Sequence, residues 1–255
     1  MLEDERMRLA ESILNDNLVY SSPRIFERRR RILKTTRDLI ATHGYDGFSI
    51  RLLCQEANVA PHTVYKAFES KERLVALSIR HYFLSFIESR TFVHDKATLQ
   101  GVIERLIVSD RHMHDSREFV IAIVALYFSQ TADTDLQVAA RMNILSTLQP
   151  WAVALRERGH LRVGVSIDSF VHSIVGLLFI VSMEWCRGNV SNEDFIIEKL
   201  QATLTFASGA TRGAGRKEID FYLSDLLGKR QLIGALQAQV EAAEAPRAET
   251  KADMA

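Results

Sequence analysis

The feature that most constrains the fold is the stretch Ser49–Phe68, in which two short amphipathic helix patterns are separated by a tight turn. Ser49 is a good N-cap, because its side-chain oxygen accepts a hydrogen bond from the first turn of the helix that follows. Asn58 is expected to end this helix, since Asn tolerates the left-handed backbone conformation. Pro61 fits the first turn of the second helix, where the N–H that it lacks would have had no partner. The stretch therefore predicts a helix-turn-helix unit.

The side chains of this unit divide into an inward and an outward set. The inward set is apolar and is expected to fix the angle between the two helices; it consists of Leu53, Cys54, Ala57, Val59, Val64 and Phe68. The outward set of the second helix carries hydrogen-bond donors and a cation, at His62, Thr63, Tyr65 and Lys66. Phosphates and base edges favour such groups over carboxylates. We expect this helix to face the major groove of DNA.

Charge is distributed unevenly although the chain as a whole is neutral. Residues 24–80 contain 12 Lys or Arg and 6 Asp or Glu, a balance of +6, so the remainder carries −6. A basic module joined to an acidic body is typical of a protein that holds phosphates at one end. Within the module, Arg28–Arg31 is interpreted as an arm that faces phosphates or the minor groove, and the alternative is a solvated helix start. The charge excess alone is also compatible with a chance distribution.

The rest of the chain is expected to be helical, because apolar residues recur at spacings of three and four and only 4 prolines are present. The predicted fold class is all-α. Gly44 should stop the first helix of the basic module, and Ser70 should cap the helix after the motif. Further helices are predicted near residues 96–110, 116–130, 133–158, 166–187, 192–208 and 217–242. Pro150 is expected to kink or divide the third of these.

The chain ends differ in character from the middle. Met1–Val19 is compatible with a short amphipathic helix and is too acidic and polar for a signal peptide. Residues 209–215 are interpreted as a linker and the last dozen residues as disordered. The apolar run Ile174–Met183 is too short to span a bilayer, so we expect a buried helix. Cys54 and Cys186 form no metal or redox motif and fit the reducing cytoplasm.

Residues 31–74 resemble the N-terminal signature of the tetracycline-repressor-like (TetR) family of transcription regulators. The resemblance rests on Arg31-Ile32-Leu33, Gly44-Tyr45-Asp46-Gly47-Phe48-Ser49-Ile50, Leu53-Cys54-Gln55-Glu56-Ala57-Asn58-Val59-Ala60 and Thr63-Val64-Tyr65-Lys66-Ala67-Phe68-Glu69-Ser70-Lys71-Glu72-Arg73-Leu74. It implies a helical dimer with an N-terminal three-helix DNA-binding head and a C-terminal helical body for ligand binding and dimerisation. The predicted boundaries are 1–23 for an N-terminal extension, 24–70 for the head, 71–208 for the body, and 209–255 for a linker, an extra helix and a disordered tail.

The resemblance also assigns DNA contacts by position. Thr63 and Tyr65 match recognition-helix contacts, and Lys71 matches a phosphate-binding lysine. Ser49 and Arg51 match polar contacts at the start of the first motif helix, whereas Pro61 and His62 match variable base-reading positions. Lys66 is added as a member of the outward set. The alternative for Lys66 and His62 is a bystander role, and for Thr63 and Tyr65 it is an ordinary surface position on an α-hairpin.

The sequence departs from the family pattern at three positions of the motif. Cys54 stands where Ala is usual, Asn58 where Gly is usual, and Ala60 where Ser usually caps the recognition helix. The missing Ser cap is expected to cost about 1 kcal/mol of local stability and one phosphate hydrogen bond.

The helices of residues 166–187 and 192–208 resemble the family's last two body helices, which pair with their copies in a dimer. The expected interface residues are Phe170, Ile174, Leu177, Leu178, Val181, Phe195, Leu200 and Leu204. The alternative is that the first of these helices, apolar on nearly every side, is the core helix of a single chain. A two-fold dimer also agrees with DNA geometry, since one helix-turn-helix reads few base pairs and half-sites lie about 34 Å apart.

A pocket for a small, mostly apolar effector is hypothesised among the body helices, lined by Met113, Phe119, Tyr127, Met142, Trp151 and His172. Core packing is the alternative for each residue taken singly.

His112 and His114 point apart on a helix, and two further metal ligands are not evident, so we expect a polar loop and no metal. No cofactor is expected. The sequence lacks phosphate-loop and nucleophile motifs, so an enzyme or a protein-binding scaffold is less favoured than a repressor that an effector releases from DNA.

Overall fold

The computed structural model describes residues 23–88 and 90–252, so the expected helix Met1–Val19 lies outside the described residues. In this part of the chain the regular elements are α-helices, with one isolated bridge between Leu161 and Thr211. The helices are α2 (Pro23–Gly47), α3 (Ile50–Glu56), α4 (Pro61–Phe68), α5 (Lys71–Glu88), α6 (Leu99–His114), α7 (Arg117–Phe128), α8 (Thr134–Glu157), α9 (Ile167–Cys186), α10 (Asn192–Ala210), α11 (Gly213–Leu227) and α12 (Gln231–Ala252). The all-α prediction is confirmed.

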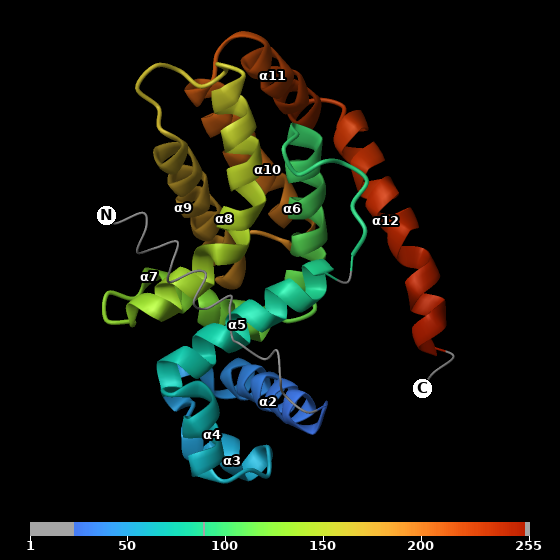
Figure 1. The fold of residues 1–255 in the computed structure, drawn as a ribbon. Helices are drawn as coiled ribbons and strands as arrows, with labels where there is room; N and C mark the ends of the chain where they lie inside the picture. The colour runs from blue at the N-terminus through green and yellow to red at the C-terminus, as the bar shows by residue number, and fades with distance from the viewer. Residues whose placement is uncertain (1–22, 89, 253–255) are drawn as a thin grey trace.

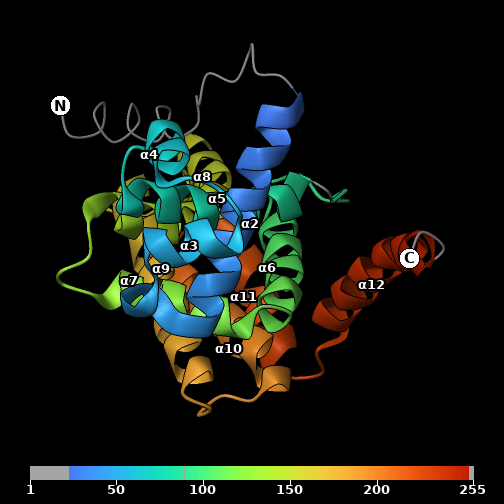
Figure 2. The same ribbon diagram turned by 90° about the horizontal axis from the view of Figure 1, so that it is seen from below.

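Helices α2, α3 and α4 form a small unit at one end of the molecule, with α3 and α4 farthest from the body (Figure 1; Figure 2). Its core contains Ile32, Ile40, Phe48, Leu53 and Phe68, each at most 1% exposed. At Gly44, near the end of α2, the backbone turns into the left-handed region (φ 69°), which glycine enters without a Cβ penalty. This break is the helix stop that the sequence predicts.

Helix α5 connects this head to the body. It packs against α2 in the head and against α8 in the body. The side chains from Leu74 to Ile79 are buried, and the Ser78 hydroxyl donates a hydrogen bond to the Leu33 carbonyl oxygen of α2 at 3.3 Å. The Ser70 hydroxyl accepts a hydrogen bond from the Arg73 N–H at 3.0 Å, as expected of the predicted cap. A displacement of α5 would therefore be transmitted to the head.

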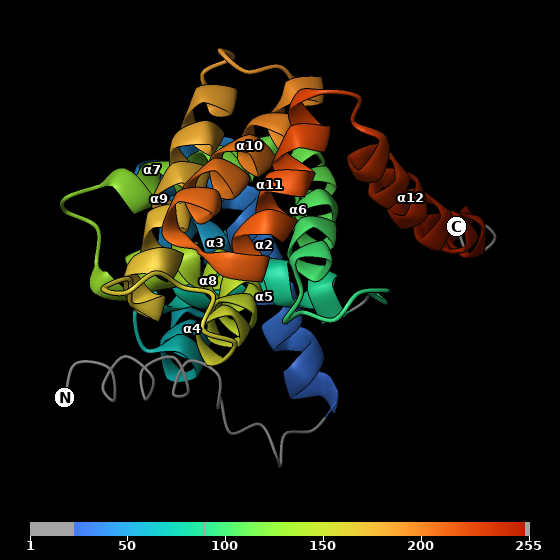
Figure 3. The ribbon, with the colours of Figure 1, turned by 90° about the horizontal axis from the view of Figure 1, so that it is seen from above.

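The body consists of α6 to α10 around a shared apolar core (Figure 3). By length and composition α9 would be able to cross a membrane, but it packs against α8 and α10 and buries Phe170, Ile174 and Leu178 completely. It is the core helix that the sequence predicts. Helix α8 continues through Pro150, so the predicted division at this proline does not occur.

The C-terminal segment differs from the prediction. The expected linker 209–215 is not extended: α10 reaches Ala210 and α11 begins at Gly213. The expected single helix is two helices, because Arg230 adopts a left-handed conformation (φ 54°) between them. Helix α11 packs on α10, whereas α12 packs on α6 and buries Ile233 and Leu236. Helix α12 also continues to Ala252, inside the stretch expected to be disordered.

Candidate nucleic-acid interface and ligand cavity

The corner between α3 and α4 has the local geometry that its sequence predicts. The Ser49 hydroxyl accepts a hydrogen bond from the Leu52 N–H at 3.2 Å. Asn58 ends α3 in the left-handed conformation (φ 49°), and Pro61 occupies the first turn of α4. Ala60 is extended, as an N-cap must be, but makes no side-chain capping bond. The corner is therefore built by the predicted residues, with one cap missing.

The inward set holds the corner together. Leu53, Ala57, Val64 and Phe68 are buried, and Cys54 and Val59 are half-buried against them. Burial raises the pKa of the Cys54 thiol, so this side chain remains protonated and behaves as a small apolar group. These contacts fix the direction in which α4 presents its other side.

The outward set lies on the opposite side of α4. His62 and Lys66 are exposed, Thr63 is half-buried, and Tyr65 is 52% exposed, unusually high for a large aromatic side chain. A shallow surface groove between α3 and α4 is lined by residues that include Arg51, Pro61 and Tyr65. Predicted contact residues from both motif helices thus lie on one face.

Lys71, at the start of α5, is half-buried near the same end of the head. Its ammonium donates a hydrogen bond to the Tyr45 carbonyl oxygen at 3.3 Å and lies 4.5 Å from the centre of the Tyr45 ring. An ammonium has three N–H donors, so this contact leaves donors for a phosphate. Lys71 therefore joins α5 to the end of α2 and remains able to hold an anion.

The basic run Arg28–Arg31 has two roles in the structure. Arg29 donates a hydrogen bond to the Ala67 carbonyl oxygen at 3.0 Å, and its guanidinium lies 4.6 Å from the centre of the Phe68 ring. It thus holds α2 against the end of α4, a role that the sequence did not indicate. Arg30 and Arg31 instead line an open groove between α2 and α5, together with Lys34.

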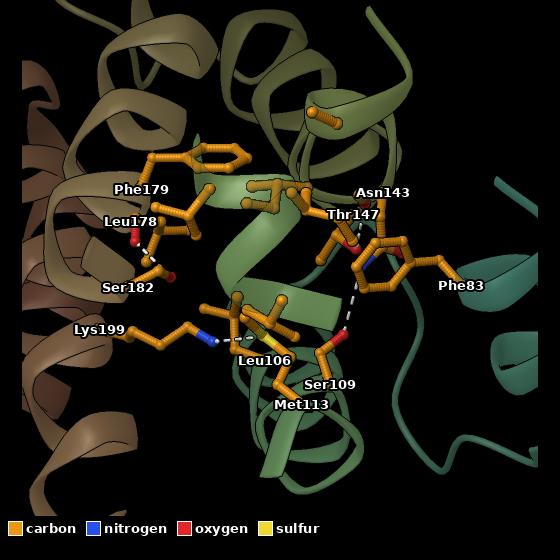
Figure 4. Close-up of a pocket in the computed structure, with 15 residues that line it drawn as sticks. Phe83, Leu106, Ser109, Met113, Asn143, Thr147, Leu178, Phe179, Ser182 and Lys199 are labelled. Atoms are coloured by element: carbon orange, nitrogen blue, oxygen red, sulfur yellow. Dashed lines mark hydrogen bonds between the residues drawn. The ribbon is translucent and has the colours of Figure 1, made fainter. Parts of the chain in front are cut away.

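A cavity of about 40 Å³ lies in the body between α5 and α10 (Figure 4). A water molecule needs roughly 10–15 Å³ by this measure, so the cavity has room for a few waters. Its lining is mostly apolar and comprises Phe83, Leu106, Ser109, Met113, Val120, Ile123, Val124, Ala140, Asn143, Ile144, Thr147, Leu178, Phe179, Ser182 and Lys199.

Among the residues predicted for an effector pocket, Met113 alone lines this cavity. Phe119 and Trp151 are buried in the core, and Tyr127 stacks on Phe179 with ring centres 3.7 Å apart. Met142 is half-buried outside the lining, and His172 is exposed on α9. The predicted set therefore needs correction, because packing of the aromatic residues against one another fills the space that they were expected to enclose.

The two histidines of α6 lie on different sides of that helix. Helix α6 extends to His114, so the expected loop is helical. His112 stacks between Tyr82 and Phe86, whereas the His114 ring lies 5.4 Å from that of Trp185. No group of three His, Cys, Asp or Glu that could hold a metal ion occurs in the described ranges.

A buried polar cluster joins α6 to α10 beside the cavity. Lys199 Nζ lies 3.7 Å from Asp110 Oδ1, and His114 Nε2 lies 3.6 Å from Asp110 Oδ2. Burial raises the pKa of Asp110 and lowers that of Lys199, because each loses the hydration of its charge. Lys199 is not among the predicted site residues, although it lies on the buried face of α10 between Ile196 and Thr203.

Comparison with known proteins agrees with the geometry of the head. Residues 32–77 match the family described as "Bacterial regulatory proteins, tetR family". The match begins in α2 and ends in α5, and so includes the whole corner. The head of this chain is therefore similar to the DNA-binding segment of the TetR family.

A curated relative matches one segment of the chain. The HTH-type transcriptional repressor KstR of Mycolicibacterium smegmatis is 35% identical over 75 residues. The matched segment makes up 29% of this chain and 35% of the length of KstR, so the chain spans about a third of this relative.

Solved structures match the fold over most of the chain. TylP, a TetR regulator from Streptomyces fradiae, has a TM-score of 0.58 at 15% identity, covering 86% of this chain and 92% of its own. SmeT, the repressor of the Stenotrophomonas maltophilia multidrug efflux pump SmeDEF, has a TM-score of 0.54 at 15% identity, covering 73% and 92%. The body therefore shares the TetR-family fold as well as the head.

The dimer interface predicted from the sequence needs correction, because only some of its residues lie at the surface of the chain. Six predicted interface residues are completely buried within the single chain and offer no area to a second copy: Phe170, Ile174, Leu178, Phe195, Leu200 and Leu204. Leu177 and Val181 are half-buried on the other side of α9, next to Ile180, which is 48% exposed. The prediction was wrong for these six residues. Helix α9, which holds Phe170, Ile174 and Leu178, is apolar on nearly every side. Its sequence pattern therefore does not distinguish the side that faces the core from the side that faces solvent.

Proposed function

We propose that the chain is a dimeric transcriptional repressor that binds operator DNA and is released by a small, mostly apolar effector. The observation that carries this proposal is the exposed side of α4, with His62, Tyr65 and Lys66, on a corner whose other side is buried. Helix α4 lies within residues 32–77, which match the TetR family, and the relative KstR is described as a transcriptional repressor.

In this proposal α4 enters the major groove, which is about 12 Å wide. Its side chains and those of α3 and α5 would then hold bases and phosphates. The proposed contacts are Ser49, Arg51, Pro61, His62, Thr63, Tyr65, Lys66 and Lys71. The Ser49 hydroxyl, which accepts the capping bond, retains its own O–H for a phosphate oxygen.

The proposed dimer uses the outer side of α9, where Leu177, Ile180 and Val181 leave apolar area accessible. Two heads are needed because each head reads one half-site, and the two half-sites of an operator lie one helical turn of DNA apart, about 34 Å. We assign residues 24–70 to the head and 71–208 to the body, and propose that α11 and α12 cover the body by packing on α10 and α6. A cytoplasmic location follows from the need to reach chromosomal DNA.

The proposed release mechanism follows α5. Phe83 of α5 lines the body cavity, whereas Lys71, at the start of the same helix, contacts the end of α2 in the head. A ligand larger than the cavity would displace Phe83 and shift α5. The effector acts only through its different affinities for the two positions of α5. The two α4 helices would then no longer match both half-sites.

The test is binding of the full chain to a duplex containing its own upstream DNA, measured by fluorescence anisotropy. Tyr65→Ala is expected to weaken binding at least tenfold, because it removes the largest exposed side chain of α4. Phe221→Ala is the matched control, since this aromatic residue is 62% exposed and belongs to α11, a helix at the end of the molecule opposite the head (Figure 1). The proposal would be wrong if both variants bound like the unchanged chain, or if that chain did not bind at low salt.

A further inference from the structure

Lys199 places a buried charge in the wall of the body cavity. Its side chain is 3% exposed and comes from α10, opposite the apolar residues Leu106 and Ile123. Figure 4 shows its ammonium pointing from α10 toward α6. Burying a charge in apolar surroundings is unfavourable unless it is paired and hydrogen-bonded. A lysine at this position therefore needs a partner.

The described chain satisfies this ammonium only in part. Lys199 Nζ lies 3.7 Å from Asp110 Oδ1, an ion pair longer than a direct hydrogen bond, and it donates a hydrogen bond to the Met113 thioether sulfur at 3.5 Å. Sulfur is a weak acceptor, and an ammonium has three N–H donors. The Phe195 ring, 4.5 Å away, adds a cation–π contact. Lys199 is thus ion-paired with Asp110 and contacts Met113 and Phe195, and its direct hydrogen bond to the described residues is the weak one to sulfur.

The arrangement selects an anion over a cation. Lys199 lines the cavity, whereas Asp110 is not part of the lining. A molecule in the cavity would therefore meet the ammonium and not the carboxylate. The remaining lining is mostly apolar, with one positive group at one end, which fits a molecule with a single acidic group and an apolar body.

We propose that the body cavity binds an amphipathic monocarboxylate, with its carboxylate on Lys199 and its apolar chain among Leu106, Ile123, Val124, Leu178 and Phe179. This inference rests on the proposed function, because it gives the chemical class of the effector. A charge-assisted hydrogen bond from the ammonium would replace the weak bond to Met113. Met113 is unbranched and flexible, so it is able to move aside.

Ligand size also follows from the cavity. At about 40 Å³ the space is far smaller than ordinary ligand pockets of roughly 300–1,000 Å³, so a carboxylate with a long chain must displace lining side chains. Each additional buried methylene is expected to strengthen binding by about fourfold. Displacement of Phe83 would then connect occupancy of the cavity to α5.

The experiment titrates the full chain with octanoate, decanoate and dodecanoate, and with decan-1-ol as the uncharged control, below their aggregation concentrations. Binding is followed by calorimetry. Decanoate is expected to bind at least tenfold more tightly than decan-1-ol, and affinity is expected to rise with chain length. In Lys199→Met the advantage of decanoate over the alcohol is expected to disappear, while the alcohol binds as before.

A second variant addresses folding. Lys199→Met leaves the buried Asp110 carboxylate without its cation. The double variant Lys199→Met with Asp110→Asn removes both charges. Circular dichroism, together with operator binding in the absence of ligand, checks that each variant is folded. The inference is overturned if decanoate binds no better than decan-1-ol, or if either folded variant retains the preference for decanoate. Lys199-dependent decanoate binding supports the site even where operator DNA is not bound, a result that would overturn only the proposed function.

Discussion

Acid is predicted to destabilise the junction of α5 and α6 through His112. The ring of His112 lies between those of Tyr82 and Phe86, with centres 4.2 Å and 3.7 Å apart. Burial lowers the pKa of this histidine from its ordinary value of 6.5 to about 4, because the charged ring would lose its hydration. The neutral form is therefore the one that packs in the folded protein.

The sign and size of the effect follow from this shift. Between pH 6.5 and 4 the unfolded chain binds a proton at His112 that the folded chain does not, so the free energy of unfolding decreases as the pH falls. Each pKa unit corresponds to about 1.36 kcal/mol. Because His112 is only partly buried and solvent screens its charge, the loss near pH 4 is expected to stay well below the ~3 kcal/mol that the full shift would give. Above pH 6.5 His112 contributes no pH dependence.

The assay is urea unfolding of the full chain at several pH values between 7.5 and 4.5, followed by tryptophan fluorescence. His112→Phe keeps a stacked ring without a titrating group, and the exposed His172→Phe is the control for the loss of one histidine. Below pH 6 the free energy of unfolding of His112→Phe is expected to fall less steeply with decreasing pH than that of the unchanged chain. If the free energy of unfolding falls equally steeply with decreasing pH in these two proteins, His112 is not held neutral in the folded chain.

Three further predictions concern the head and the glycines. Ala60→Ser supplies the missing cap of α4 and is expected to stabilise the chain by about 1 kcal/mol in urea unfolding; unchanged stability would contradict this. Arg29→Met removes the bond to the Ala67 carbonyl and is expected to cost about 1–3 kcal/mol, and an unaltered urea midpoint would count against that role. Gly101→Ala places a Cβ 2.0 Å from the Asp95 carbonyl oxygen and should lower the melting temperature, whereas Gly209→Ala, whose Cβ meets no described atom within 4 Å, should not.

Features set by a few neighbouring residues could be predicted from the sequence. The stop at Gly44, the cap at Ser49 and the left-handed Asn58 depend on local backbone chemistry, which a short stretch of sequence contains. The helix boundaries of the body agree to within a few residues for the same reason, because apolar periodicity and capping residues act locally. The head was therefore predicted in detail.

Features set by packing between distant helices could not be predicted in this way. Helix α9 is apolar all round, so its sequence does not say that Ile174 is buried within the chain and that Ile180 is exposed. The cavity depends on how six helices, α5 to α10, approach one another, and Tyr127 fills space against Phe179 instead of enclosing it. Lys199 carries a usable signal in the sequence, because it is a charged residue among the inward-facing positions of α10.

The most direct test of the central claim is selection of bound duplexes from random DNA by the full chain, followed by sequencing. An exposed α4 on each subunit of a dimer predicts enrichment of an inverted repeat whose half-sites are about one helical turn, or a multiple of it, apart. Tyr65→Ala is expected to lose this enrichment, and Phe221→Ala to retain it. Absence of any enriched sequence with the unchanged chain, or the same enrichment with Tyr65→Ala, would contradict the assignment of α4 as the DNA-reading helix.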